Sequence, residues 1–217
     1  MTVTTAHATA RTHDARTRQL LAGSIAGTVV FGVVSLAQAF TRDGFDPTRH
    51  PLSMLSNGDL GWLQITNFLV SGLLTFIGAL GLRRALRGTP GGTWAPRLAA
   101  TWGVALFLSG PFVLQAGDGF PVGDPGVPGM TAGSIGHLLA GTIGFTALIA
   151  ACYVLGRHYS RTGERRLALG SRIAGTAFLV GDLYSMAGLP AGALILAITA
   201  LTAMSWLAVA AHVERTR

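Results

Sequence analysis

Residues 19–40 read QLLAGSIAGTVVFGVVSLAQAF and contain no charged side chain. A helix of about 20 such residues, at 1.5 Å per residue, crosses a hydrocarbon core of roughly 30 Å. Lipid offers no hydrogen-bond partners, so a spanning backbone must be a helix or a closed barrel, and the abundant glycine and alanine favour closely packed helices. Five further segments are of similar length and mainly apolar, at 61–82, 97–116, 136–156, 167–188 and 191–212, although Arg172 and Asp182 interrupt the fifth of the six. The sequence therefore predicts an all-α, polytopic membrane protein, a bundle of six transmembrane helices.

The composition of the whole chain agrees with that architecture. Of 217 residues, 50% are hydrophobic and only 12% charged, against roughly 25% charged in ordinary soluble domains. The 16 basic residues are all arginines and flank the apolar segments without forming one stripe, so nucleic acid is not expected as a partner. The single cysteine, Cys152, excludes an intramolecular disulfide and a cysteine-rich zinc site.

The arginines also predict an orientation. Short basic loops stay in the cytoplasm, and with six spans 14 of the arginines lie on one side of the membrane. Only Arg42 and Arg49 lie on the other side. We expect an inner (cytoplasmic) membrane protein with both termini in the cytoplasm. Residues 1–18 would form a flexible basic tail, 19–212 a single membrane domain, and 213–217 a short cytoplasmic tail.

The first segment invites a second interpretation. Basic residues, an apolar stretch and Ala37-Gln38-Ala39 together resemble a secretory signal with its cleavage motif. The apolar stretch is longer than the 7–15 residues usual for such a signal. A retained first helix is therefore the favoured interpretation. Cleavage would leave five spans.

Polar chemistry is concentrated on the predicted outer side, in the loops at 41–62 and 117–125. These loops hold five of the nine carboxylates. His50 lies in the first loop, while His137 and Asp182 fall near the outer ends of the fourth and fifth segments. Because consecutive helices share their outer ends, we expect Arg49, His50, Asp118 and His137 to converge in one vestibule.

Several of these residues resemble a known family. The run from Asp46 to Ser53 (DPTRHPLS), the run from Leu55 to Trp62 (LSNGDLGW) and the later Asp118-Gly-Phe-Pro are similar to the bacterial membrane family called domain of unknown function 998. The resemblance extends over essentially residues 19–212. It implies a six-helix integral membrane protein, common in actinobacteria, with no assigned reaction and therefore no catalytic residues to transfer. Asp182 has no counterpart in the family pattern.

The first loop admits a structural and a functional interpretation. In the structural one, caps and prolines stiffen the loop, Trp62 lies at the membrane interface, and Arg42, Arg49 and His50 pair with neighbouring carboxylates. In the functional one, an anionic group is held near the membrane surface, since the guanidinium fork suits phosphate or carboxylate. The candidate ligand-binding residues are Arg49, His50, Ser53, Asn57 and Asp118, with Ser56 as a further donor.

His137 and Asp182 are the candidates for acid–base chemistry. His137 shares a helical face with small residues, so it points at a neighbouring helix; it is either hydrogen-bonded to a loop carbonyl or active in proton transfer. A carboxylate within hydrocarbon costs about 2.5–3.5 kcal/mol, so Asp182 either lies at the wet interface or has a function. Ser185, three residues on, shares its face.

No strong enzyme signature accompanies these residues. The sequence lacks HExxH, GxxxxGK[ST] and a correctly placed GxGxxG, and we expect no cofactor and no metal. The leading hypothesis is a protein that binds, and in one version transports or senses, a membrane lipid or a small amphipathic ligand at the vestibule. The alternatives are a membrane enzyme acting on a lipid or isoprenoid through Asp182 or His137, and a proton-coupled exporter.

Overall fold

The computed structural model describes residues 13–217, and all of its regular secondary-structure elements over that range are helices. Its elements are α1 (Ala15–Thr41), the short 3-10 helix η1 (Leu52–Ser56), α2 (Gly61–Ala85), α3 (Trp94–Leu108), α4 (Ala132–Arg161), α5 (Arg165–Met186) and α6 (Gly192–Arg215). The all-α class and the six long helices are therefore confirmed.

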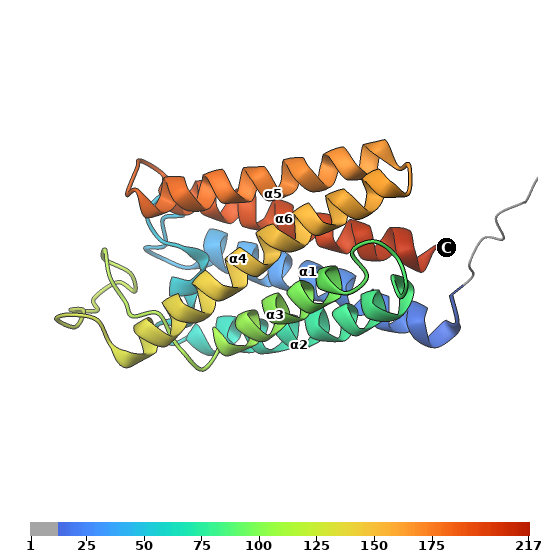
Figure 1. The fold of residues 1–217 in the computed structure, drawn as a ribbon. Helices are drawn as coiled ribbons and strands as arrows, with labels where there is room; N and C mark the ends of the chain where they lie inside the picture. The colour runs from blue at the N-terminus through green and yellow to red at the C-terminus, as the bar shows by residue number, and fades with distance from the viewer. Residues whose placement is uncertain (1–12) are drawn as a thin grey trace, which may run out of the picture.

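The six helices form a closed ring. Each packs against its successor in sequence, and α6 packs back against α1. Figure 1 shows the helices running side by side, with the loops after α1, α3 and α5 at one end of the bundle. The loops after α2 and α4, the start of α1 and the C-terminus lie at the other end. We call these the loop end and the arginine end.

The observed bounds differ most from the predicted ones at α3. The predicted third segment runs to residue 116, but the helix ends at Leu108 and leaves 109–116 without helical structure. Pro111 lacks the N–H that would continue the ladder, and its ring disfavours helical backbone just before it. At the two chain ends the helices reach into the predicted tails. α1 begins at Ala15, where the Asp14 carboxylate accepts from the Thr17 amide (2.7 Å), and α6 ends at Arg215.

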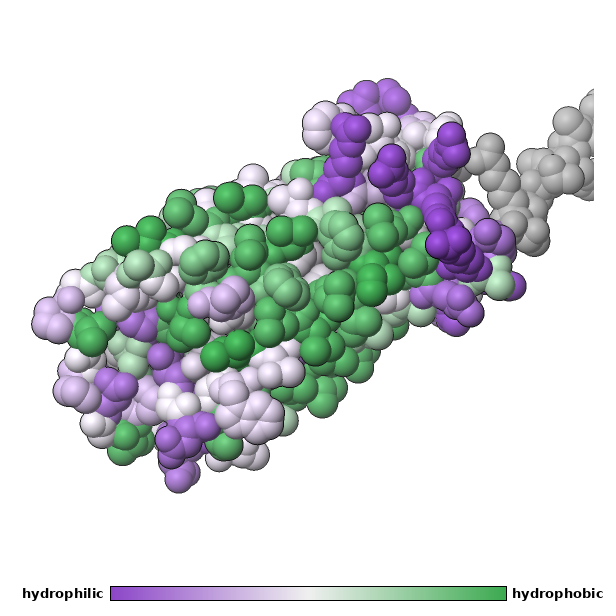
Figure 2. All heavy atoms as spheres, turned by 90° about the horizontal axis from the view of Figure 1, so that it is seen from below, coloured by the Kyte–Doolittle hydropathy of each residue, from purple (hydrophilic) through white to green (hydrophobic). Residues whose placement is uncertain are grey.

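Four helices, α1, α2, α4 and α6, are long and apolar enough to cross a membrane by length and composition. A broad apolar band covers the middle of the face in Figure 2, between polar residues at both ends. At 15 residues α3 measures only about 22 Å, and α5 carries Arg165, Arg166, Arg172 and Asp182. The chain is thus a multi-pass membrane protein by these criteria. That all six helices cross the membrane stays a prediction.

Small residues let α1 and α2 approach closely. A Cβ added at Gly23 would lie 2.5 Å from the carbonyl oxygen of Leu74, and one at Gly78 would lie 2.4 Å from the amide nitrogen of Ser24. A Cβ at Gly27 would also meet the α2 backbone at 2.9 Å, which agrees with the close helix packing expected from the abundant glycine. Gly170 likewise receives the indole ring of Trp206.

The same interface contains a buried network of amides and hydroxyls that the sequence analysis missed. Gln64 Oε1 accepts from Gln38 Nε2 (2.9 Å) and from Asn67 Nδ2 (3.2 Å), and Gln64 Nε2 donates to Ser35 Oγ (3.1 Å). Ser71 extends the network through Asn67 Oδ1. All five side chains are at least 95% buried. Gln38 belongs to the signal-like triplet, so in the folded protein the central residue of this triplet lies in the α1–α2 contact.

We predict that Gly78→Ala lowers the midpoint of thermal unfolding of the detergent-solubilised protein. The added methyl has to push α1 away from α2, and overpacking of this kind costs about 1–3 kcal/mol. The control is Gly141→Ala, the same change on α4, where nothing lies within 4 Å of the new Cβ. That variant should unfold at the wild-type temperature or above it, because alanine favours helix. Equal midpoints for the two variants would refute the close α1–α2 contact.

Candidate binding site

The loop after α1 (the first loop) and the loop after α3 (the third loop) fold together at the loop end. Phe45, Met54 and Leu55 of the first loop form a small apolar cluster with Ala39 and with Phe120 of the third. The rings of Phe45 and Phe120 meet edge to face with centroids 5.2 Å apart. This cluster fixes one loop on the other and thereby sets the position of their polar residues.

His50 fastens the two loops from within. Its Nδ1 accepts from the amide of Asp46 (2.9 Å), so Nε2 carries the proton and donates to the carbonyl oxygen of Asp118 (3.1 Å). The Arg49 guanidinium donates to the same carbonyl (2.9 Å). The two donors hold Asp118 in the left-handed backbone region (φ 52°). His50 is only 2% exposed and has both ring nitrogens engaged, which favours a structural role over direct ligand binding.

Arg42 and Asn57 organise the second half of the first loop. Arg42 donates to the carbonyl oxygens of Leu55 (2.5 Å) and Asn57 (2.6 Å), and its guanidinium lies 4.8 Å above the Phe120 ring. Partial burial lowers the pKa of this guanidinium. Asn57 Nδ2 donates to the carbonyls of Met54 and Leu114. Both residues thus satisfy loop carbonyls.

The expected arginine–carboxylate and histidine–carboxylate pairs do not form in residues 13–217. The two ion pairs found there, Arg217–Glu164 and Arg217–Glu214, lie at the arginine end. The reason is geometric: loop carbonyls need donors, and Arg42, Arg49 and His50 supply them. The Asp46 carboxylate instead accepts from the amide and hydroxyl of Thr48, which lowers the pKa of Asp46.

A cavity of about 670 Å³ lies beside the first loop, bounded by α4, α5 and α6; we call it the vestibule. Its wall contains five of the predicted candidates: Arg49, Ser53, Asp118, His137 and Asp182. The predicted convergence of Arg49, Asp118 and His137 is confirmed, and His50 is joined to them through the Asp118 carbonyl. His50 and Asn57 support this wall from the loop side.

A second, apolar cavity of about 90 Å³ lies further inside the bundle; we call it the inner chamber. Phe31, Phe68, Trp102 and Met204 are among its walls. The two cavities share the wall residues Pro51, Ser53, His137, Gly141, Phe145, Ala193 and Leu196. The site therefore grades from a mouth of mixed polar and apolar lining to an apolar interior.

His137 and Asp182 differ in how they are held. His137 Nδ1 donates to the carbonyl oxygen of Phe112 (2.8 Å), in the segment after α3, which confirms the predicted bond to a loop carbonyl. The Asp182 carboxylate has no hydrogen bond or ion pair with any residue in 13–217. It is half-buried in the vestibule wall. His137 is thus fixed by a hydrogen bond, whereas the Asp182 carboxylate has no hydrogen-bond or ion-pair partner in residues 13–217.

Sequence reasoning missed several cavity residues. Thr142 and Thr146 of α4 line the vestibule together with Leu138. Their spacing of four residues is the signal that would have found them, because positions i, i+4 and i+8 share one face of a helix. The start of α4 is fixed separately by Gln115, whose amide oxygen accepts from the Thr131 amide and the Ser134 hydroxyl.

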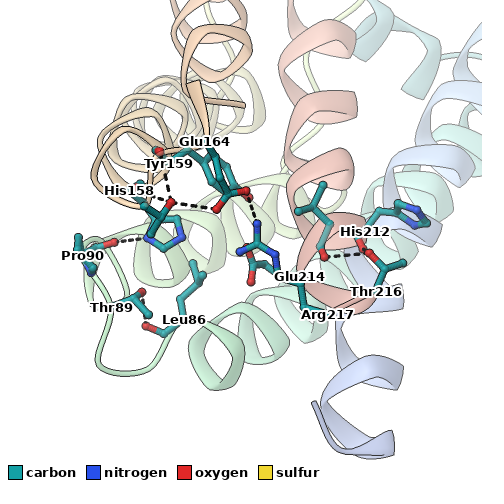
Figure 3. Close-up of polar contacts among 12 residues, drawn as sticks. Leu86, Thr89, Pro90, His158, Tyr159, Glu164, His212, Glu214, Thr216 and Arg217 are labelled. Atoms are coloured by element: carbon teal, nitrogen blue, oxygen red, sulfur yellow. Dashed lines mark hydrogen bonds and ion pairs between the residues drawn. The ribbon is translucent and has the colours of Figure 1, made fainter. Parts of the chain in front are cut away.

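A second polar cluster lies at the arginine end (Figure 3). Arg217 pairs with Glu164, from the α4–α5 turn, and with Glu214 of α6. Beside it the His158 imidazole donates to the carbonyl of Pro90 (2.6 Å), and the Tyr159 ring is fully buried. The cluster thus ties the α2–α3 connection, the α4–α5 turn and α6 together. No group of three or more metal-ligating side chains occurs in the described part of the chain.

We predict that His50→Ala lowers the stability of the protein more than Arg49→Ala does, because His50 supports the vestibule wall from inside and Arg49 lies on its surface. His50→Ala removes two buried hydrogen bonds and should destabilise the protein by about 1–3 kcal/mol. Arg49→Ala changes an exposed side chain and should cost about 0.5 kcal/mol or less. Thermal unfolding of both purified variants measures the difference. A larger loss for Arg49→Ala would mean that the roles are reversed.

Comparison with known proteins gives one match. The family model described as protein of unknown function (DUF998) matches residues 25–213. This range covers all six helices and both loops of the vestibule except the first turns of α1 and the last residues of α6. No curated protein and no solved structure matches the chain at a significant level.

Proposed function

We propose that this protein binds a membrane lipid or a small amphipathic molecule in the vestibule. The chain belongs to the DUF998 family of proteins of unknown function. The observation that carries the proposal is the pairing of two cavities. The vestibule, of about 670 Å³ and lined by both polar and apolar residues, shares wall residues with the apolar inner chamber of about 90 Å³. An amphipathic molecule has the same division, and binding sites of this kind are mostly apolar with a few placed polar groups.

The proposal includes the orientation in the membrane. We propose that all six helices cross the inner membrane and that both termini lie in the cytoplasm. The alternation of loops between the two ends of the bundle supports this arrangement. The gathering of arginines in the helix ends and connections at one end supports it as well. After the shorter α3 the chain continues through the non-helical segment 109–116, in which Ser109 and Gly110 are buried and the Phe112 amide donates to the carbonyl of Leu108.

Cysteine labelling in intact cells tests the orientation. Single cysteines at Thr89 and Thr162, in the connections at the arginine end, should be shielded from an impermeant thiol reagent. A cysteine at Val122, which is 71% exposed at the loop end, should react. Cys152 is fully buried and should stay silent. All three engineered sites should react after permeabilisation, and labelling at Thr162 in intact cells would reverse the proposed orientation.

Filling the shared wall of the two cavities tests binding itself. We expect native mass spectrometry of the gently extracted protein to show a retained lipid, and Ala193→Trp to remove it, because Ala193 borders both cavities. Leu139→Trp is the control: this α4 residue is 60% exposed and lies in neither cavity wall. The control should retain the lipid. Equal lipid occupancy in both variants would contradict binding in the vestibule.

One observation favours a second candidate function. His137 and Asp182 line the same cavity, as an acid–base pair in a membrane enzyme would require. An enzyme alters a lipid substrate without any gradient, a proton-coupled exporter needs a gradient, and a binding protein does neither. Incubation of the purified protein with membrane lipid extract, followed by product analysis, separates the enzyme from the binding protein.

A further inference from the structure

We infer that the vestibule selects amphiphiles with a cationic amine headgroup and that Asp182 is the counter-ion. The inference rests on the proposed function, since it names the chemical class of the molecule bound there. It also reverses the charge expected from the first loop, where Arg49 predicts an anionic ligand. Three features of the described residues carry it.

The first feature is the unused charge of Asp182. A carboxylate on an apolar helix needs a hydrogen-bond donor or a cation to compensate for the water it has lost. No residue in 13–217 supplies one, although the carboxylate is half-buried and lines a cavity. Structural carboxylates in this protein do have partners, as Asp14 and Glu214 do. The partner of Asp182 is therefore expected to come from the cavity.

The second feature is the chemistry of the helical wall. Besides Asp182, this wall presents the hydroxyls of Ser185 on α5 and of Thr142 and Thr146 on α4. An ammonium group has three donors and no acceptor, so a carboxylate flanked by hydroxyl oxygens satisfies it. The one guanidinium of the vestibule, Arg49, lies on the loop side, is exposed, and already donates to the Asp118 carbonyl. Arginine and lysine are absent from the α4, α5 and α6 residues of the wall.

The third feature is the position of the opening. α4 and α5 diverge toward the loop end in Figure 1. Below the vestibule they are joined by the rings of Phe145 and Phe178 (centroids 5.0 Å apart) and by the Tyr153–Thr176 hydrogen bond (2.7 Å). Thr142 and Thr146 line the vestibule and are nevertheless exposed, so the cavity opens sideways between the two helices. An amphiphile lying in the membrane can therefore bring its headgroup to Asp182 while its tail stays in an apolar environment.

Three probes with the same twelve-carbon tail test the inference: dodecylamine, dodecanol and dodecyl phosphate. Each is titrated into the purified full-length protein in an uncharged detergent, and binding is followed by native mass spectrometry. We expect the amine to bind about ten-fold more tightly than the alcohol, as one partly desolvated charge pair allows. The phosphate should bind no more tightly than the alcohol.

Variants assign the preference to a residue. Asp182→Asn should reduce the amine to the affinity of the alcohol and leave the alcohol unchanged. Asp182→Glu keeps the charge and should retain the preference. Asp43→Asn is the matched control, because Asp43 is an exposed carboxylate at the same end of the bundle but outside the vestibule wall. It should behave as wild type.

The outcomes separate this inference from the proposed function. Equal binding of amine and alcohol to the wild type would overturn the inference and leave amphiphile binding intact. Tightest binding of the phosphate, lost in Arg49→Ala, would overturn it in favour of an anion site. Failure of all three probes to bind would overturn both. These comparisons use the wild-type protein and Arg49→Ala, so they decide the headgroup preference even if Asp182→Asn does not fold, and Asp182→Glu still tests the residue.

Discussion

The structure depends on one constraint: between the two polar ends of the bundle, lipid offers no hydrogen-bond partners, so most polar groups there find their partners inside the protein. The α1–α2 interface shows the consequence most clearly. Gln64, which is fully buried, binds Ser35 and Gln38 of the neighbouring helix and Asn67 of its own. These bonds form only in one register of α1 on α2. Glycines at the contact bring the two backbones close enough for that register to hold.

At the loop end the same constraint is met differently. The loops have no regular backbone ladder, so side chains supply the missing donors: Arg42 to two carbonyls, His50 and Arg49 to a third. Several residues that the sequence suggests as ligand-binding groups are therefore already hydrogen-bonded to loop carbonyls. The Asp182 carboxylate has no such bond within residues 13–217, and it gives the vestibule its chemical character.

The sequence predicts the helices well because each apolar segment carries its own signal of length and composition. It predicts the convergence of Arg49, Asp118 and His137 because hairpin connectivity alone brings neighbouring helix ends together. It does not predict the early end of α3, where Pro111 stops a segment that hydropathy alone would continue. The partners of Gln38 and Gln64 also escape prediction, since they depend on the rotation of one helix against another.

The two ends of the ring are held together by different contacts. At the arginine end Arg217 bridges Glu164 and Glu214, and His158 holds the α2–α3 connection through the carbonyl of Pro90. At the loop end α4 and α5 part, and the turn from α5 to α6 spans only residues 187–191. Side-chain ion pairs thus join the helices at the arginine end, whereas at the loop end the space bounded by α4, α5 and α6 is the vestibule, whose wall includes Asp182.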